Sequence, residues 1–225
     1  MADNKGLLFA YTDHGELVNE AEFHDWYDGE HIPVRAAVPG MGTISRYKQV
    51  DGQKPNWLAL YDMSSPEVAT TEPYTKLPSS DNEKRIISNL ATLNGAIYSL
   101  ISASATSPKA TPGKFLCIAM MEPSVEGEDE FNKWYEEEHI SLLSKAPGWI
   151  RSRRFKLVRE IRLPGKEDAG SKLKYLALHE LQNKEVMDTP EWIHAGTPWR
   201  NKVVNELVLR REIRLFELYR TWGSE

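Results

Sequence analysis

The sequence predicts an α+β fold: two tandem ferredoxin-like βαββαβ repeats whose sheets pack into a single-chain pseudo-dimeric α+β barrel. One observation is a doubled motif, EFHDWYDGEHIP at residues 22–33 and EFNKWYEEEHIS at residues 130–141. A second is that the apolar periodicities around the two copies give the same order of strands and helices. The third is physical: such a unit covers one sheet face with helices and leaves the other face bare, and two bare faces packed together would both be buried.

The two copies align in a constant register over their first halves. His31 and His139 lie 108 residues apart, and ten of the residues that are unchanged at this offset are Phe23, Trp26, Tyr27, Glu30, His31, Ile32, Pro39, Gly40, Arg46 and Lys48. A period near 110 residues is too long for a solenoid unit, so it indicates a duplicated domain.

Later in the copies the offset is 118 residues, as between Tyr61 and His179. We assign the ten extra residues to a longer hairpin loop in the polar run REIRLPGKEDAGSK, residues 159–172. We expect the first repeat at 1–103, a Ser-, Thr- and Pro-rich linker at 104–113, and the second repeat at 114–225.

The elements of the first repeat follow from its periodicities. GLLFAYT (6–12) is a short apolar run typical of a strand, and residues 19–38 have helical spacing. Two further strand-like runs, TISRYKQV (43–50) and NWLALYDM (56–63), are separated by turn residues. Helical or mixed segments broken by prolines follow, SPEVATTEPYTKL and DNEKRIISNL, and AIYSLISA (96–103) closes the repeat as a strand.

The second repeat gives the same order. Its predicted elements are KFLCIAMM, the helix at about 128–145, WIRSRRFKLV, LKYLALHEL, the helical segments PEWIHA and NKVVNEL, and the final strand IRLFELYRTW.

The motif residues are expected on one helix face. At 100° per residue, Phe23, Trp26, Tyr27, Glu30 and His31 span about 140°, and this face should pack on the sheet. A glutamate and a histidine buried there each need a hydrogen-bond partner or a cavity. Two interpretations remain open: a proton-transferring site, or an EHIP cap in which Pro33 ends the helix and His31 bonds the last carbonyls.

The WYxxEHI helix, set in a βαββαβ unit and followed by PG and a strand carrying Arg and Tyr, resembles the EthD-like branch of the dimeric α+β barrel superfamily, in the tandem form common among fungal proteins. That superfamily includes polyketide cyclases, muconolactone isomerases, cofactor-free quinone-forming monooxygenases, decarboxylases of aromatic polyketides and, on more distant branches, haem enzymes. The resemblance implies a largely apolar pocket between helix and sheet with the histidine as general acid or base. Carried onto this chain, the catalytic positions are His31 with Tyr27 and Glu30, and His139 with Tyr135 and Glu138.

Other side chains are expected to line the pockets. The candidates for substrate binding are Trp26, Trp134, Tyr11, Tyr61, His179, Arg46 and Arg154. Tyr61 and His179 occupy equivalent strand positions and would complete a His/Tyr or a His/His pair, although alternation alone leaves their faces undetermined.

The remaining candidates have simpler interpretations. We expect His14, His24 and His194 at the surface and Cys117 in the core. Gly29, inside the motif, marks either a close approach of backbone or ligand or a tolerated surface glycine.

Composition excludes several classes. The chain is 40% hydrophobic with a net charge of −5, which is not the composition of a nucleic-acid binder. No apolar run approaches a membrane span, and the N-terminus lacks the order of a secretory signal, so a cytoplasmic protein is expected. Metal-ligand spacings, a P-loop, GxGxxG and GxSxG are missing from the sequence, so no metal and no cofactor are expected, with haem on an axial histidine as a minor alternative.

The leading hypothesis is therefore a cofactor-independent enzyme that uses histidine acid/base chemistry on a small apolar, aromatic or polyketide-like molecule. Cyclisation, isomerisation, dehydration and decarboxylation are all compatible with it. The alternatives are a cofactor-free monooxygenase of anthrone-like phenols and a non-catalytic ligand-binding barrel. All of these hypotheses are compatible with a monomer that has an internal pseudo-twofold and with a homodimer.

Overall fold

The computed structural model describes residues 5–107, 112–162 and 172–223. In hydrogen-bond order its strands run β1-β3-β2-β8-β5-β7-β6-β4 and close into a barrel, which confirms the predicted fold class. Clustering of contacts gives two compact units. The first unit comprises Met1–Leu100, Leu157–Lys172 and Tyr219–Glu225, and the second unit comprises Ile101–Lys156 and Leu173–Leu218.

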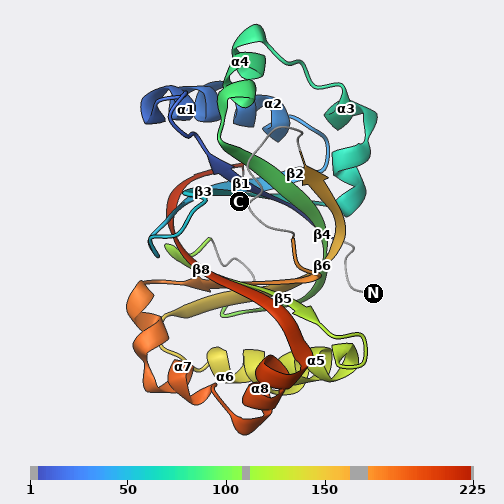
Figure 1. The fold of residues 1–225 in the computed structure, drawn as a ribbon, viewed down its shortest axis with the longest axis vertical. Helices are drawn as coiled ribbons and strands as arrows, with labels where there is room; N and C mark the ends of the chain where they lie inside the picture. The colour runs from blue at the N-terminus through green and yellow to red at the C-terminus, as the bar shows by residue number, and fades with distance from the viewer. Residues whose placement is uncertain (1–4, 108–111, 163–171, 224–225) are drawn as a thin grey trace. The chain divides into compact units, whose positions relative to one another are not determined.

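The first unit has the antiparallel strand order of a ferredoxin-like sheet. Its strands, in spatial order, are β4 (Thr92–Ala105), β1 (Gly6–Asp13), β3 (Trp57–Met63) and β2 (Met41–Gln49). Helices α1 (Glu20–Trp26), α2 (Ile32–Ala36) and α4 (Asp81–Asn89) lie over one face of this sheet, as Figure 1 shows. The shorter elements η2 (Pro66–Thr70) and α3 (Glu72–Thr75) fill the segment expected to be helical or mixed.

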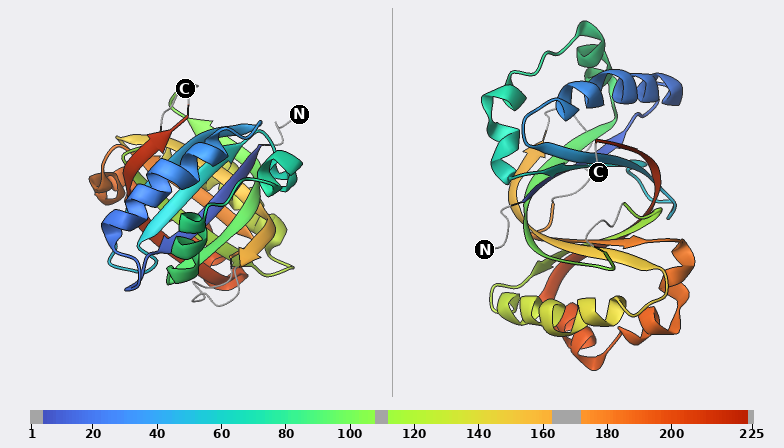
Figure 2. Two further views of the ribbon diagram at one scale, coloured as in Figure 1. Left: turned by 90° about the horizontal axis from the view of Figure 1, so that it is seen from above. Right: turned by 180° about the vertical axis from the view of Figure 1, so that it is seen from behind.

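The second unit repeats this arrangement. Its sheet contains β8 (Val208–Trp222), β5 (Phe115–Pro123), β7 (Tyr175–Leu181) and β6 (Trp149–Arg162) in that order. Its helical elements are α5 (Glu128–Trp134), α6 (Ile140–Leu143), η4 (Lys184–Asp188), α7 (Pro190–His194), α8 (Pro198–Lys202) and the π-helical turn η5 (Val203–Leu207). Helices α5 and α6 lie end to end along one sheet face (Figure 2).

Side-chain alternation on the strands builds the layer between sheet and helices. In the first unit Trp57, Ala59 and Tyr61 point toward the helices and join one core cluster with Phe23 and Trp26. The equivalent cluster of the second unit contains Phe131, Trp134, Tyr135 and Tyr175. The motif tyrosines and tryptophans and Tyr61 therefore sit within this buried layer.

Two predictions about loops need adjustment. Strand β6 continues to Arg162, so the run expected to be a hairpin loop begins as strand, and residues 163–171 lie outside the described residues. Strand β4 likewise continues to Ala105, into the run expected to be a linker, and residues 108–111 lie outside the described ranges.

Each motif helix contains a π-helical turn that the 3.6-residue period did not predict. These turns are η1 (Tyr27–His31) and η3 (Tyr135–His139), closed by bonds from the Ile32 and Ile140 N–H groups to the carbonyls five residues earlier. In the first unit the helix continues through Pro33 to Ala36, so the interpretation of EHIP as the end of the helix is wrong. Because Ser141 stands in place of Pro33 in the second copy, proline is not the cause of the turn.

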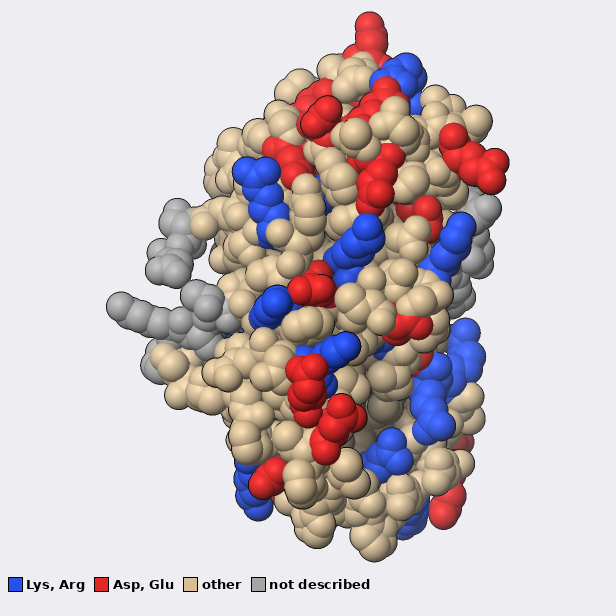
Figure 3. All heavy atoms as spheres, turned by 90° about the vertical axis from the view of Figure 1, so that its left-hand side faces the viewer, with Lys and Arg blue, Asp and Glu red and all other residues tan. Residues whose placement is uncertain are grey.

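Within the described ranges, every helix is too short or too polar to span a bilayer. On the face drawn in Figure 3, acidic and basic side chains are interspersed.

Candidate functional site

The first unit contains a cavity between its π-helical turn and its sheet. This first cavity has a volume of about 250 Å³, and Tyr27, His31 and Arg35 line it from the helix side. Tyr61 and Asn94 line it from β3 and β4, and apolar side chains such as Leu8, Ile87, Leu93 and Ile161 complete its wall. The cavity is therefore mostly apolar with a few convergent polar groups, as small-molecule sites usually are.

His31 is held in the first cavity by a carboxylate. Its Nδ1 lies 2.9 Å from Oε1 of Glu83, a residue of α4, and both side chains are buried. Because an ionised carboxylate only accepts, Nδ1 carries the proton, and the lone pair of a neutral ring lies on Nε2. Burial lowers the pKa of His31 to about 4 although the Glu83 hydrogen bond opposes this, and the same hydrogen bond lowers the pKa of Glu83. At neutral pH the pair is a neutral imidazole oriented by a carboxylate.

Arg35 completes the polar wall of the first cavity. Its Nη1 donates to the His31 carbonyl oxygen at 3.0 Å and lies 3.4 Å from Glu83 Oε1. The guanidinium therefore balances the Glu83 charge and fixes the backbone of the π-helical turn.

Two tyrosines place a hydroxyl donor at the same cavity. The Tyr27 and Tyr61 hydroxyls share a buried hydrogen bond of 3.0 Å. Burial raises the pKa of both phenols, so they stay protonated at neutral pH. Since their mutual bond uses only one of their two protons, the accepting hydroxyl keeps a proton to donate to a bound molecule.

The second unit contains a larger cavity at the equivalent place. This second cavity has a volume of about 350 Å³ and is lined by Tyr135 and His139 from the π-helical turn, by Cys117 and His179 from the sheet, and by Arg200 from α8. The His139 and His179 rings are 6.3 Å apart between centroids and nearly perpendicular, so the structure brings the expected His/His pair together. In the first unit Tyr61 instead bonds Tyr27.

The two histidines of the second cavity differ in their partners. His139 Nδ1 is buried, and no hydrogen-bond partner is found for it among the described residues. His179 Nδ1 lies 2.8 Å from the Ser152 hydroxyl, which accepts from the Trp149 indole at 2.9 Å. The Ser152 proton is then left to donate to Nδ1, which places the His179 proton on Nε2.

Burial also lowers the pKa values of this pair. It brings the pKa of His179 to about 4, with the Arg154 charge adding to the effect. It holds the pKa of His139 well below the ordinary value, reinforced by His179, Arg200 and Arg154. Both rings are therefore neutral at pH 7.

Glu30 and Glu138 do not face the cavities, contrary to the expected helix face. The five-residue turn rotates them outward, where Glu30 accepts from Ser80 and from the Asn82 amide at 3.0 Å, and Glu138 accepts from Thr197 at 3.0 Å. Ser80 and Thr197 are the N-caps of α4 and α8. The two glutamates therefore tie the motif helices to the N-termini of α4 and α8.

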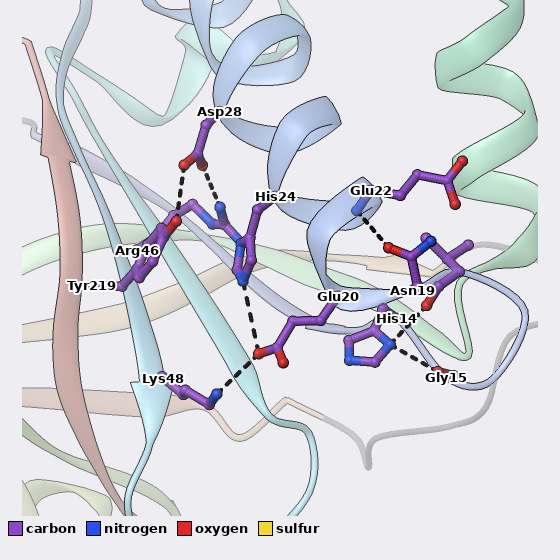
Figure 4. A network of polar contacts seen from close by, with 11 residues as sticks. His14, Gly15, Asn19, Glu20, Glu22, His24, Asp28, Arg46, Lys48 and Tyr219 are labelled. Atoms are coloured by element: carbon purple, nitrogen blue, oxygen red, sulfur yellow. Dashed lines mark hydrogen bonds and ion pairs between the residues drawn. The ribbon is translucent and has the colours of Figure 1, made fainter.

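Arg46 and Arg154 line neither of the two cavities. Each stacks on a motif tyrosine and pairs with an acidic side chain, an arrangement that we call the arginine clamp. Each guanidinium lies 4.1 Å from a ring centroid, over Tyr27 and over Tyr135. Arg46 pairs with Asp28 and donates to His24 Nδ1 at 3.2 Å. Figure 4 shows Asp28 bound to both Arg46 and Tyr219.

The clamp is repeated at the equivalent positions of the second unit. There Arg154 donates to Glu136 at 3.0 Å and to Asn132 at 2.7 Å.

The remaining candidates are distributed as follows. Trp134 lines the second cavity and stacks on His139 with 4.3 Å between centroids, whereas Trp26 packs 4.7 Å from the His31 ring in the core. Tyr11 does not join Leu8 at the first cavity: strand alternation turns it to the opposite sheet face, where it packs on Phe9 at 4.7 Å. Gly29 is exposed, and a Cβ there would meet no atom within 4 Å, as for a tolerated surface glycine.

Two of the four residues for which we expected no functional role lie where we predicted them. Cys117 is buried and His194 is exposed, as predicted. His14 and His24 are half-buried instead, because the His14 ring bonds backbone carbonyls and His24 stacks on Tyr219.

Four side chains important to the cavities were missed from the sequence: Glu83, Arg35, Ser152 and Arg200. Only Glu83 had a local signal, since Ser80-x-x-Glu83 is a capping-box pattern. That pattern predicts a helix start, and the Ser80 hydroxyl does accept from the Glu83 N–H at 2.9 Å. It does not predict that the carboxylate turns to His31.

Comparisons with known proteins give the fold. No protein-family model matches the chain, and no curated protein matches it. A solved structure described as an anthrone oxidase-like protein has a TM-score of 0.65 at 12% identity, covering 98% of this chain and 93% of that one.

Two further solved structures match at similar coverage. A putative monooxygenase from Fusobacterium nucleatum has a TM-score of 0.64 at 7% identity, covering 100% of this chain and 96% of that one. A chlorite dismutase from Candidatus Nitrospira defluvii has a TM-score of 0.56 at 11% identity, covering 98% and 93%. At these identities the likeness shows the fold alone.

Proposed function

We propose that the first cavity is the active site of a small-molecule enzyme and that His31 is its general base. The observation that carries this proposal is the contact of 2.9 Å between His31 Nδ1 and Glu83 Oε1. It fixes the tautomer that leaves Nε2 basic, in a ring that lines a cavity. A base oriented by a carboxylate is the usual arrangement for proton abstraction in enzymes.

The tyrosine pair supplies the complementary group. When a proton is removed next to a carbonyl or from a phenol, negative charge develops on oxygen. The spare proton of the Tyr27–Tyr61 pair would stabilise that oxyanion beside the base, since the Tyr27 and His31 ring centroids are 4.8 Å apart. A positioned base contributes about 10² to 10⁴ in rate, and an oxyanion donor about 10² to 10³.

The apolar wall indicates the class of substrate. Leu8, Ile87, Leu93 and Ile161 leave few polar contacts, which favours a small aromatic or polyketide-like ketone. Cyclisation, isomerisation and dehydration of such a molecule begin with removal of a proton to give an enolate, so one base serves these three reactions. Decarboxylation gives the enolate by loss of CO₂ instead, and the carbon is then reprotonated.

Cofactor-free oxygenation is a second candidate. It is favoured by two solved structures that share this fold, which are described as an anthrone oxidase-like protein and a putative monooxygenase. The same base would ionise an anthrone-like phenol, and one O₂ would then convert anthrone to anthraquinone and water. The two candidates share their first step and differ in O₂ consumption.

Proton abstraction can be measured directly. We would follow deuterium exchange into the methylene of anthrone and of 1- and 2-tetralone by NMR under nitrogen, and O₂ uptake with anthrone in air. His31→Gln should slow catalysed exchange by about 100-fold or more. The matched variant His139→Gln, in the second cavity, should leave it unchanged.

Glu83→Gln separates the orienting role from folding. This variant should slow exchange while retaining a hydrogen bond to the His31 ring. In the wild type the exchange rate should rise with pH through about 4 and be level by pH 7, as expected for the pKa of His31. Wild-type exchange equal to the uncatalysed rate for all three ketones, or exchange unaffected by His31→Gln, would contradict the proposal. A loss of melting temperature alone would instead favour the non-catalytic ligand-binding protein.

A further inference from the structure

The two cavities carry opposite charge at one equivalent position. In α4 and α8 the N-cap hydroxyls of Ser80 and Thr197 accept from the N–H groups of Glu83 and Arg200, at 2.9 and 3.0 Å. The first unit thus has a carboxylate at this position, bound to the motif histidine, and the second has a guanidinium that lines the cavity with the motif histidine. The second unit therefore has a cation, Arg200, at the position where the first unit has an anion, Glu83.

Two polar groups of the second cavity, Arg200 and His179, are hydrogen-bond donors. The Arg200 side chain donates from Nη1 to the Asn201 side-chain oxygen at 3.1 Å, and a guanidinium carries five N–H groups. His179 presents Nε2–H because its Nδ1 accepts from Ser152. His139 adds a buried Nδ1 without a partner among the described residues. The described residues that line this cavity include no aspartate or glutamate to accept from these groups.

The rest of the second cavity is apolar and reaches the surface. Trp134, Leu143 and Val204 are buried in its wall. Ile193 and Ile213 also line it and are 65% and 44% exposed, so its mouth is rimmed by hydrophobic side chains. A molecule that fits both parts has an apolar body and an acidic end.

We propose that the second cavity binds an apolar monocarboxylic acid as its anion, with the carboxylate held by Arg200 and the two histidines. Arginine matches a carboxylate with two parallel hydrogen bonds, and one guanidinium balances one negative charge. The volume of about 350 Å³ accommodates a small organic acid. This site is separate from the proposed base in the first cavity and does not depend on it.

The surroundings of His139 support an anionic occupant. Besides burial, its pKa is lowered by His179 of β7, Arg200 of α8 and Arg154 of β6. The Tyr135 and Cys117 side chains that also face the cavity stay neutral, because burial raises the pKa of each to about 12. A carboxylate is therefore the charge that this group of side chains lacks.

The test is equilibrium binding of benzoate, 1-naphthoate and decanoate at pH 7, each compared by calorimetry with its neutral primary amide. We expect at least one acid to bind about tenfold or more tightly than its amide. Arg200→Gln should weaken binding of that acid by about 10- to 100-fold and leave its amide unchanged. Arg35→Gln, which removes the arginine of the first cavity, should leave binding of the acid unchanged.

Three outcomes would overturn the proposal: every amide binds as tightly as its acid, none of the acids binds, or the two arginine variants weaken binding equally. Urea unfolding of each variant, together with Arg200→Lys, which keeps the charge, separates lost binding from lost folding. His31→Gln should abolish proton exchange in the first cavity without changing this affinity, so failure of either proposal leaves the other standing.

Discussion

Replacing Asp28 with alanine should destabilise the first unit by about 3–5 kcal/mol, because it removes the anion from a buried pair. The Arg46 side chain is only 1% exposed and that of Asp28 is 12% exposed. After the substitution the Arg46 guanidinium would keep its hydrogen bond to His24 Nδ1, at 3.2 Å, and its cation–π contact with the Tyr27 ring. Neither compensates a charge, so most of the cost of burying the cation would remain.

The second unit supplies a matched control. Glu136, the partner of Arg154, is 48% exposed, and such solvated pairs contribute about 0–1 kcal/mol. Arg154 would also keep its hydrogen bond to the side-chain oxygen Oδ1 of Asn132, at 2.7 Å. Glu136→Ala should therefore cost about 1 kcal/mol or less, although the residue occupies the same place in the repeat.

Thermal unfolding followed by circular dichroism measures the difference. For a chain of this size each kcal/mol lowers the melting temperature by about 2–4 °C, so Asp28→Ala should lower it by about 6–20 °C and Glu136→Ala by at most about 4 °C. Asp28→Asn, which keeps an acceptor, should fall between them. Equal shifts for the two alanine variants would refute the reasoning that burial of the partner sets the cost.

The pKa of about 4 for both His31 and His179 predicts a pH-dependent stability. Below pH 6.5 these histidines bind protons in the unfolded chain but not in the folded one. The free energy of unfolding should therefore fall by about 1.4 kcal/mol per pH unit per histidine as the pH is lowered from 6.5 to 4. Urea titrations of His31→Gln and His179→Gln should each show a shallower fall. Ser80→Ala and Thr197→Ala should each cost about 1 kcal/mol in the same assay, because each removes an N-cap, and an unchanged midpoint would contradict the capping role. Burial raises the pKa of the Cys117 thiol to about 12, so its reaction with a disulfide reagent at pH 8 should be about a thousand-fold slower in the folded protein than in urea, and equal rates would count against this burial.

The fold could be predicted because the duplication and the periodicities agree at every element. The doubled motif fixed the register of the repeats, and alternating apolar runs identified the strands on both sides of it. The faces of Tyr61 and His179 could not be assigned, because nearly every residue of β3 and all of β7 is buried. When both faces of a strand are apolar, the alternation of residue types does not show toward which sheet face a given side chain points.

The site was predicted only in part, for a different reason. The motif identified Tyr27, His31 and their equivalents, but it did not reveal the π-helical turn, which depends on backbone bonds that no residue pattern specifies. That turn is what moves Glu30 out to Ser80. Glu83, which bonds His31, and Arg200, which lines the cavity of His139, each lie more than 50 residues from that histidine in sequence and have no fixed spacing to the motif.

The doubled motif is therefore best understood as a scaffold around which two different cavities are built. The residues kept in both units hold the backbone: the arginine over the tyrosine ring at 4.1 Å, and the motif glutamate bound to an N-cap hydroxyl. The residues that differ, Tyr61 against His179 and Glu83 against Arg200, are those that bond the motif side chains or line the cavities with them. Because the clamps hold the turn in either unit, charge inside a cavity can change without loss of the fold. In our proposals, a base oriented by a carboxylate and a binding site for a carboxylate thus arise from one duplicated helix.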